Sequence, residues 1–194
     1  MNELNHPIKP VEDLPEILIS ADRIAQRIAE LGNEINRDYV GLNPLLVGVL
    51  KGVIIFMADL IRIIEIPIEV DFIAVTNYSP VSRDQGFVRL VKDLEIPIQN
   101  RHVIFVEDVV DTGMTLNYLL QNLQTRIPAS MEVCTLFNKP KHRIINLPMR
   151  YIGFDLPDKF VVGYGLDFHE QYRYLPYLGV LSPTQYKSRF AYNG

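Results

Sequence analysis

The stretch VIFVEDVVDTGMTL, residues 103–116, decides how the rest of the chain is interpreted. Its first four residues are apolar and partly β-branched, which is typical of a strand buried on both faces of a sheet. Two acids, Glu107 and Asp108, come next, and the segment from Asp111 to Thr115 leads into residues with helical spacing: Leu116, Leu119, Leu120 and Leu123. Main-chain N–H groups at a helix start favour an anion. The stretch therefore predicts a strand, a turn and a helix that together bind a phosphate.

The individual residues of the turn suit a phosphate and a sugar. Gly113 allows the main chain to approach a phosphate closely, and Thr112 and Thr115 supply hydroxyl donors. The acids cannot bind phosphate, so their targets are ribose hydroxyls, a divalent cation or a proton. Taken separately, an acid pair after a strand is often a solvated loop, and Asp-Thr-Gly is a common turn.

The composition indicates one domain, which we place at residues 1–194. The chain has 194 residues, 48% of them hydrophobic, and a formal net charge of −4, which predicts no non-specific binding to nucleic acid. No apolar segment reaches the roughly 20 residues of a membrane span, and the first residues do not resemble a signal peptide. The single cysteine, Cys134, lies among apolar residues and is interpreted as a core residue. These features favour a cytoplasmic protein without membrane partners.

Strands and helices alternate along the chain. Strands are predicted at 17–19, 44–50, 68–75, 87–91, 131–137, 151–154 and 160–163, and helices at 53–64 and from an N-cap at Ser20 to about 38–41. The polar segment 77–86 is predicted as a loop. This order indicates an α/β fold with a central, mainly parallel sheet flanked by helices. Ligands bind such sheets at the carboxyl ends of strands, so Lys51, Glu107, Asp108 and Lys139 are expected at one rim.

The whole stretch 103–116 resembles the phosphoribosyl-pyrophosphate signature of the type I phosphoribosyltransferases: four apolar residues, two acids, two apolar residues and Asp-Thr-Gly-X-Thr. The resemblance implies that Glu107 and Asp108 handle the ribose hydroxyls with Mg²⁺ nearby. It also implies that the loop of Asp111, Thr112, Gly113, Met114 and Thr115 holds the 5′-phosphate. Met114 stands where the family commonly has Lys or Arg, which reduces the charge complementarity of that loop.

Two further segments resemble the pyrophosphate-binding parts of the family. The sequence Leu50-Lys51-Gly52 matches the hypoxanthine-guanine branch, whose Lys-Gly bond can be cis. Without the family, it is a turn with a solvated lysine. The segment 77–86 corresponds to a flexible loop that closes over the reacting bond, with Asn77 in place of the usual serine, and Tyr78 retained. The resemblance also assigns Arg173 to pyrophosphate.

The base site of the same branch is matched by two segments. The resemblance implies that Lys139 donates to the oxygen at purine C6, that Phe160 stacks on the base, and that the main chain of Val161 contacts the base edge. Asp167 would hold a second Mg²⁺ through water. Without the family, Phe160 and Val161 are core residues, and Asp167 and Arg173 are solvated. A small hood is expected from the N-terminal stretch and residues 140–194.

The implied activity is purine salvage: transfer of a 5-phosphoribosyl group from phosphoribosyl pyrophosphate to N9 of a 6-oxopurine, which releases pyrophosphate. Asp111 is the candidate catalytic base near purine N7. The closest resemblance is to the bacterial hypoxanthine-guanine branch, and hypoxanthine, guanine and xanthine remain open as substrates. A sensor of phosphoribosyl pyrophosphate with the same fold, or an enzyme for another base, is the alternative. Relatives form homodimers or homotetramers, and the same is expected here.

Overall fold

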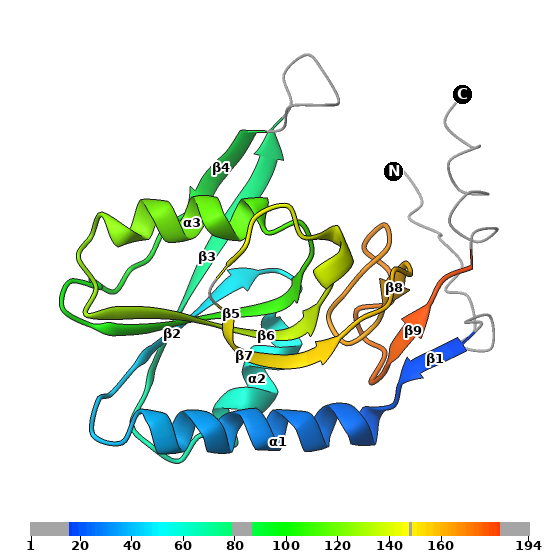
Figure 1. The fold of residues 1–194 in the computed structure, drawn as a ribbon, viewed down its shortest axis with the longest axis horizontal. Coiled ribbons are helices and arrows are strands. Elements are labelled where there is room, and N and C mark those ends of the chain that lie inside the picture. The colour runs from blue at the N-terminus through cyan, green and yellow to red at the C-terminus, as the bar shows by residue number, and fades with distance from the viewer. Residues whose placement is uncertain (1–15, 79–86, 148, 183–194) are drawn as a thin grey trace, which may run out of the picture.

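Strand β5 (His102–Val110), which contains the first part of the stretch 103–116, lies inside a six-stranded central sheet (Figure 1). The computed structural model describes residues 16–78, 87–147 and 149–182. The strand order is β4-β3-β2-β5-β6-β7, and all neighbouring pairs are parallel except β3 and β4. The other strands of this sheet are β2 (Leu45–Leu50), β3 (Glu69–Tyr78), β4 (Phe87–Lys92), β6 (Ser130–Asn138) and β7 (Met149–Asp155).

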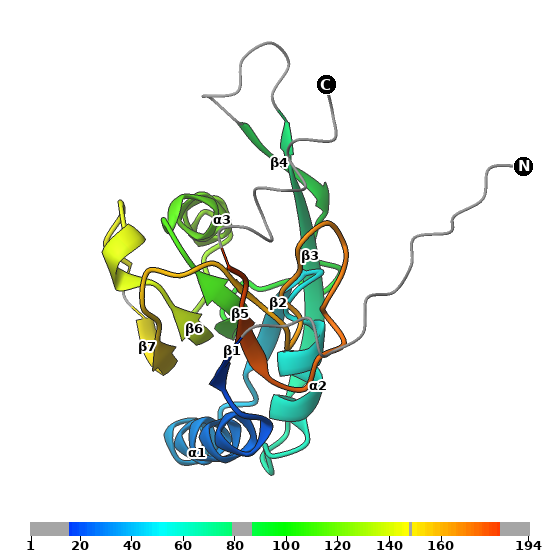
Figure 2. The same cartoon turned by 90° about the vertical axis from the view of Figure 1, so that its right-hand side faces the viewer.

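Helices cover both faces of this sheet, and Figure 2 shows them on its opposite sides. Helices α1 (Ala21–Asp38) and α2 (Ile54–Ile61) share a hydrophobic cluster with Leu46 and Ile104, whereas α3 (Met114–Gln124) packs in another cluster with Leu45 and Val103. Adjacent residues of β2 and β5 thus point to opposite faces, and each finds apolar neighbours. This arrangement explains why the two strands are nearly continuous apolar runs.

The first helix begins and faces the core as its sequence predicts. The Ser20 hydroxyl accepts a hydrogen bond from the main-chain N–H of Arg23 at 3.4 Å, which caps the helix. The residues of its apolar face are buried: Ile24, Ile28, Leu31 and Ile35. Cys134 is also completely buried in the core, as expected, and burial raises the pKa of its thiol.

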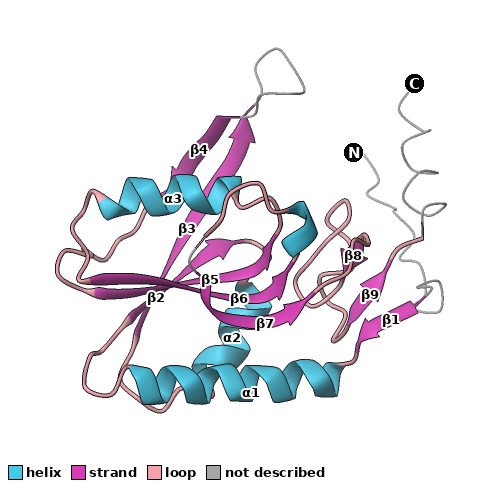
Figure 3. Ribbon diagram, in the orientation of Figure 1, coloured by secondary structure: helices cyan, strands magenta, loops and turns pink. Residues whose placement is uncertain are grey.

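A second, smaller sheet lies beside the carboxyl ends of the central strands (Figure 3). It joins β1 (Glu16–Ile19), β9 (Leu178–Val180) and β8 (Val161–Val162) through antiparallel pairs. The segments expected to form the hood contribute these strands. The limits of a single domain at 1–194 stay a prediction, because the structure does not describe the chain ends.

Three sequence-based expectations were wrong in detail. Glu107 and Asp108 do not follow the central strand but lie within it, because β5 keeps pairing with β6 as far as Val110 and Asn138. Asn77 and Tyr78 belong to β3, not to a loop, and the rest of the predicted loop, 79–86, lies outside the described residues. Helix α2 is shorter than the predicted 53–64. No helix in the described ranges is long and apolar enough to cross a membrane.

Candidate active site

The carboxyl ends of three adjacent parallel strands, β2, β5 and β6, carry five of the candidate functional residues: Lys51, Glu107, Asp108, Asp111 and Lys139. Two cavities open at this rim, with volumes of about 670 and 360 Å³. Asp111 and Lys139 line both cavities. The Lys139 ammonium lies 3.9 Å from Asp111 Oδ2, and only 12% of the lysine side chain is exposed. The two cavities therefore meet at a lysine and an acid, as the order of the strands predicts.

The two acids of β5 are held away from water. Glu107 is 8% exposed, and its burial, followed by the charge of Asp108, raises its pKa well above the usual value. Burial raises the pKa of Asp108 to about 6, although its Oδ1 accepts a hydrogen bond from the main-chain N–H of Val109 at 2.7 Å. Within the described residues, no cation forms an ion pair with either acid. A bound cation would therefore stabilise the ionised forms of Glu107 and Asp108, which burial disfavours.

The chemistry of these two acids fits a hard divalent cation such as Mg²⁺, which binds carboxylates and keeps oxygen ligands from water or substrate. Among the described residues, however, no group of three or more His, Cys, Asp or Glu side chains could hold a metal. Glu107 and Asp108 alone would leave most coordination positions to other oxygens. The residues thus fit Mg²⁺ only together with oxygen ligands from water or another molecule.

The turn after β5 leads directly into a helix. Gly113 has φ of +83°, a conformation that favours glycine, and α3 begins directly after it. The Thr112 hydroxyl accepts from the main-chain N–H of Met114 at 3.3 Å, and the Met114 side chain is exposed. Arg143 fixes the turn from the other side, because its guanidinium donates to the carbonyl oxygens of Val110 and Asp111. Side-chain hydrogen bonds therefore hold the turn where the sequence predicts a phosphate site.

The Lys51-Gly52 turn packs against the acids of β5. A Cβ atom at Gly52 would lie 1.7 Å from Asp108 Oδ2, so a larger residue there would have to displace the carboxylate. The cis peptide bond is Leu50–Lys51, one residue before the bond that the resemblance suggested. Lys51 and Arg173, both predicted to bind pyrophosphate, contact Glu170 at 3.2 and 3.4 Å. These two cations thus share one acid in this structure.

Asp167 and Arg173 are paired rather than solvated. The guanidinium of Arg173 lies 2.8 Å from Asp167 Oδ1 and donates to the carbonyl oxygen of Gly165 at 2.8 Å. Its Nε is buried and has no hydrogen-bond partner in the described part of the chain. Both side chains line the smaller cavity with Lys51, Gly52 and Asp108. This cavity has the cations that an anionic group requires.

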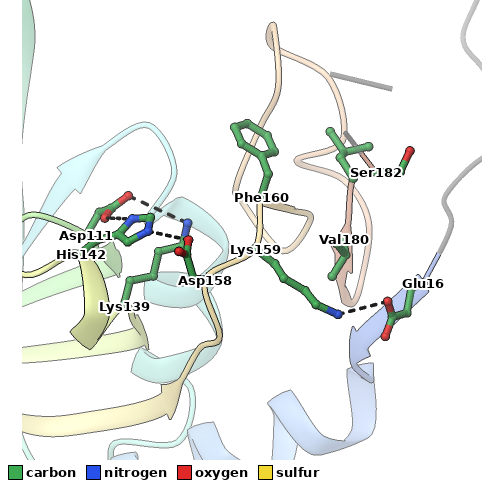
Figure 4. A pocket seen from close by; sticks show the side chains of 10 residues that line it. Glu16, Asp111, Lys139, His142, Asp158, Lys159, Phe160, Val180 and Ser182 are labelled. Atoms are coloured by element: carbon green, nitrogen blue, oxygen red, sulfur yellow. Dashed lines mark hydrogen bonds and ion pairs between the residues drawn. The ribbon is translucent and has the colours of Figure 1, made fainter. Parts of the chain in front are cut away.

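The larger cavity has a charged side and an aromatic side (Figure 4). Phe160 is 40% exposed, and its ring meets Phe168 edge to face with centroids 5.4 Å apart. Lys139 and Asp111 lie across from it. Val161 is buried and lines the smaller cavity. A flat heterocycle between Phe160 and Lys139 would therefore have an apolar ring on one side and a donor at its edge.

Sequence reasoning missed two residues beside Asp111. His142, in the short helix η2 (Pro140–His142), places Nδ1 2.9 Å from Asp111 Oδ1 and Nε2 2.6 Å from Asp158 Oδ1. No pattern in the Pro/Lys/Arg-containing segment 138–150 distinguishes this histidine. Asp158 was noted only as part of a segment that resembles the family. Glu170, the acid shared by the two cations, was missed as well.

The comparisons with known proteins agree with this geometry. The phosphoribosyl transferase domain family matches residues 16–169. The chain is 47% identical to a hypoxanthine-guanine phosphoribosyltransferase of Mycobacterium avium over 191 residues, which cover 93% of this chain and 94% of the relative. The corresponding protein of Bacillus subtilis is 42% identical over 176 residues, covering 91% and 98% of the two chains.

Solved structures give the same assignment. A hypoxanthine phosphoribosyltransferase of Staphylococcus aureus superimposes with a TM-score of 0.86 at 38% identity, covering 99% of this chain and all of the other. The enzyme from Trypanosoma cruzi gives a TM-score of 0.87 at 37% identity, covering 94% and 99%. The fold and the site define a phosphoribosyltransferase of type I. The chain belongs to the phosphoribosyl transferase domain family, and its relatives from Mycobacterium avium and Bacillus subtilis come from the hypoxanthine-guanine branch.

Proposed function

We propose that this protein transfers the 5-phosphoribosyl group of phosphoribosyl pyrophosphate to N9 of hypoxanthine or guanine and releases pyrophosphate, in the purine-salvage role of its relatives. One observation carries the proposal: a cavity lined by the cations Lys51 and Arg173 and a cavity lined by Phe160 meet at Asp111 and Lys139. A group transfer between two substrates requires such a junction, since both reacting atoms must lie within about 3–3.5 Å of each other.

The larger cavity is assigned to the purine base. Phe160 would stack on the ring, the main chain of Val161 would contact its edge, and the Lys139 ammonium would donate to the oxygen at C6. An ammonium has no acceptor, so it favours a 6-oxo over a 6-amino purine. Asp111 would accept the proton of N7, or a hydrogen bond from it, as N9 attacks the ribose carbon.

The smaller cavity is assigned to the ribose and pyrophosphate, and the turn after β5, whose residues 112–115 line neither of the two cavities, is assigned to the 5′-phosphate. Glu107 and Asp108 would bind the ribose hydroxyls and place negative charge near the oxocarbenium-like carbon. The segment from Thr112 to Thr115, with Gly113 and Met114, would hold the 5′-phosphate through N–H and hydroxyl groups. The side chains assigned to pyrophosphate are Lys51, Asn77, Tyr78 and Arg173, together with the main chain of Gly52.

Mg²⁺ is the metal that the two buried acids suit, and when bound it would neutralise the charge of the leaving pyrophosphate. Glu107 and Asp108 would face it near the ribose, and Asp167 would face a second ion through water. The protein's own contribution is the negative charge of these acids and the shape of the cavity. A homodimer or homotetramer in the cytoplasm remains our expectation for the assembly and its location.

The test is product formation from phosphoribosyl pyrophosphate and Mg²⁺ with hypoxanthine, guanine, xanthine and adenine, compared as kcat/KM. We expect rapid turnover of hypoxanthine and guanine, with adenine inert. Asp111→Asn should lower kcat by about 100-fold, the lower end of what a positioned acid or base contributes, with little change in the KM for phosphoribosyl pyrophosphate. No turnover of any base, with Mg²⁺-dependent substrate binding intact, would instead indicate a sensor.

A further inference from the structure

Asp111 is held in place by a side chain that the proposed reaction does not use. His142 Nδ1 contacts Asp111 Oδ1 at 2.9 Å, and the other carboxylate oxygen, Oδ2, is the one nearest to Lys139 Nζ. Asp111 and His142 both line the larger cavity, and Figure 4 shows them side by side, opposite Phe160. The contact with His142 therefore occupies one oxygen and leaves the other facing the lysine.

The imidazole is itself oriented from its far side. Asp158, in the segment after β7, lies 2.6 Å from His142 Nε2. A carboxylate only accepts hydrogen bonds, and a neutral imidazole carries one N–H. Both contacts can be hydrogen bonds only if both ring nitrogens carry hydrogen or one of the two acids is protonated. In either case Asp158 lies against the nitrogen opposite the one that contacts Asp111, so the ring is oriented from both sides.

The main chain around Asp111 is fixed separately. Arg143 donates from Nε to the carbonyl oxygen of Asp111 at 3.0 Å, and its Nη2 donates to the carbonyl oxygen of Val110 at 3.1 Å. The guanidinium thus sets the backbone of the turn, whereas His142 acts on the carboxylate alone. Loss of the imidazole should therefore free the rotation of one side chain without disturbing the turn.

We infer that His142 is a positioning residue for Asp111: with Asp158 behind it, the imidazole holds the carboxylate so that Oδ2 faces the purine base. This inference rests on the proposed function, because it assigns a direction to the group that would act on N7. Small misplacements of a catalytic group cost large factors in rate. Loss of the contact should therefore lower kcat and leave the binding of phosphoribosyl pyrophosphate unchanged.

Two amide variants separate the two ends of the imidazole. An asparagine amide nitrogen occupies about the place of histidine Nδ1, and a glutamine amide nitrogen about that of Nε2. His142→Asn should keep the donor to Asp111, whereas His142→Gln should keep only the donor to Asp158. Lys141→Ala is the matched control, since Lys141 is an exposed residue of the same short helix.

The experiment measures kcat and both KM values with hypoxanthine for the wild type and these variants, together with the thermal unfolding midpoint of each. His142→Ala and His142→Gln should lose about tenfold in kcat, the size of one hydrogen bond to a charged group. Their KM for phosphoribosyl pyrophosphate should stay at the wild-type value, and His142→Asn should recover most of the rate. The Lys141→Ala enzyme should behave as the wild type.

Two results would overturn the inference in an active enzyme. One is an unchanged kcat in His142→Ala, and the other is a recovery by His142→Gln equal to that by His142→Asn. Failure of the proposed function gives a different pattern, in which the wild type turns over no base or Asp111→Asn retains full activity.

Discussion

The charge of Asp108 should make the free protein less stable as pH rises, and Asp108→Asn should reverse this loss. Burial lifts the pKa of this carboxyl from 3.8 to about 6 in the folded protein, which corresponds to about 3 kcal/mol of unfavourable free energy once the group is ionised. An asparagine keeps the acceptor for the N–H of Val109 and cannot ionise. The variant should therefore gain up to this amount at pH 7.5.

The sign of the pH dependence follows from proton binding. Between pH 3.8 and about 6, the folded protein keeps the Asp108 proton that the unfolded chain has lost, so stability from this group falls as pH rises. The raised pKa of Glu107, caused by burial and then by the charge of Asp108, acts in the same direction. The advantage of Asp108→Asn should therefore be small at pH 4 and reach its full size above pH 6.

Urea unfolding of the wild type and the variant at pH 4, 5, 6 and 7.5 measures this difference, with equal m-values as the condition for comparing midpoints. Asp93→Asn is a control of opposite sign, because two hydrogen bonds from Arg126 at 2.8 Å lower the pKa of Asp93. That substitution should destabilise the protein at pH 7.5. A difference between Asp108→Asn and wild type that does not change from pH 4 to 7.5 would refute the reasoning.

Three further substitutions test the assigned contacts. Lys139→Ala should abolish the preference for 6-oxo over 6-amino purines, and an intact preference in kcat/KM would exclude its assignment. Gly52→Ala should displace the Asp108 carboxylate, which its Cβ would meet at 1.7 Å. Substrate binding, measured by calorimetry, should therefore weaken, whereas the melting temperature should stay close to that of the wild type. Glu170→Gln should tighten pyrophosphate binding about threefold, because one exposed ion pair is worth about 0.2–1 kcal/mol; unchanged or weaker binding would show that Glu170 does not compete for these cations.

Much of the fold could be predicted because apolar patterns report burial directly. Successive side chains of β2 and β5 pack into apolar clusters on opposite faces of the sheet, so both strands are apolar throughout. The buried face of α1 is visible in the sequence as the helical spacing of Ile24, Ile28, Leu31 and Ile35. The rule for carboxyl ends of parallel strands then placed Lys51 and Lys139 at the same rim as the acids. These inferences need only local periodicity and the topology of a parallel sheet.

The end of β5 could not be predicted in the same way. Its last residues include two acids, which a pattern of hydrophobicity assigns to a loop, yet their main chain still pairs with β6 through Val110. The main-chain groups pair with the neighbouring strand, while the Asp108 side chain lines the smaller cavity and Glu107 is buried beside it. Polar residues at a functional site thus mislead a burial pattern for the same reason that they carry function.

His142 escaped prediction for another reason. Its role depends on two acids that are 31 and 16 residues away in the sequence, one after β5 and one after β7. Only the order of the strands brings them together, and no spacing in the sequence marks the contact. The pairing of Glu170 with Lys51, 119 residues apart, has the same origin.

On the proposed function, the charges at the rim should favour joint binding of a phosphorylated sugar and a divalent cation. Glu107 is buried, Asp108 is largely buried, and neither forms an ion pair with a cation within the described residues, whereas Lys51 pairs with the exposed Glu170 and Arg173 with Glu170 and Asp167. An anion alone would pair with Lys51 and Arg173 but would add repulsion near the acids. A cation alone would satisfy the acids but would add repulsion near Lys51 and Arg173. A ligand that supplies both charges pairs with the acids and with the basic side chains at once. The unfavourable free energy of the ionised acids would therefore favour binding of the metal-bound substrate over either ion alone.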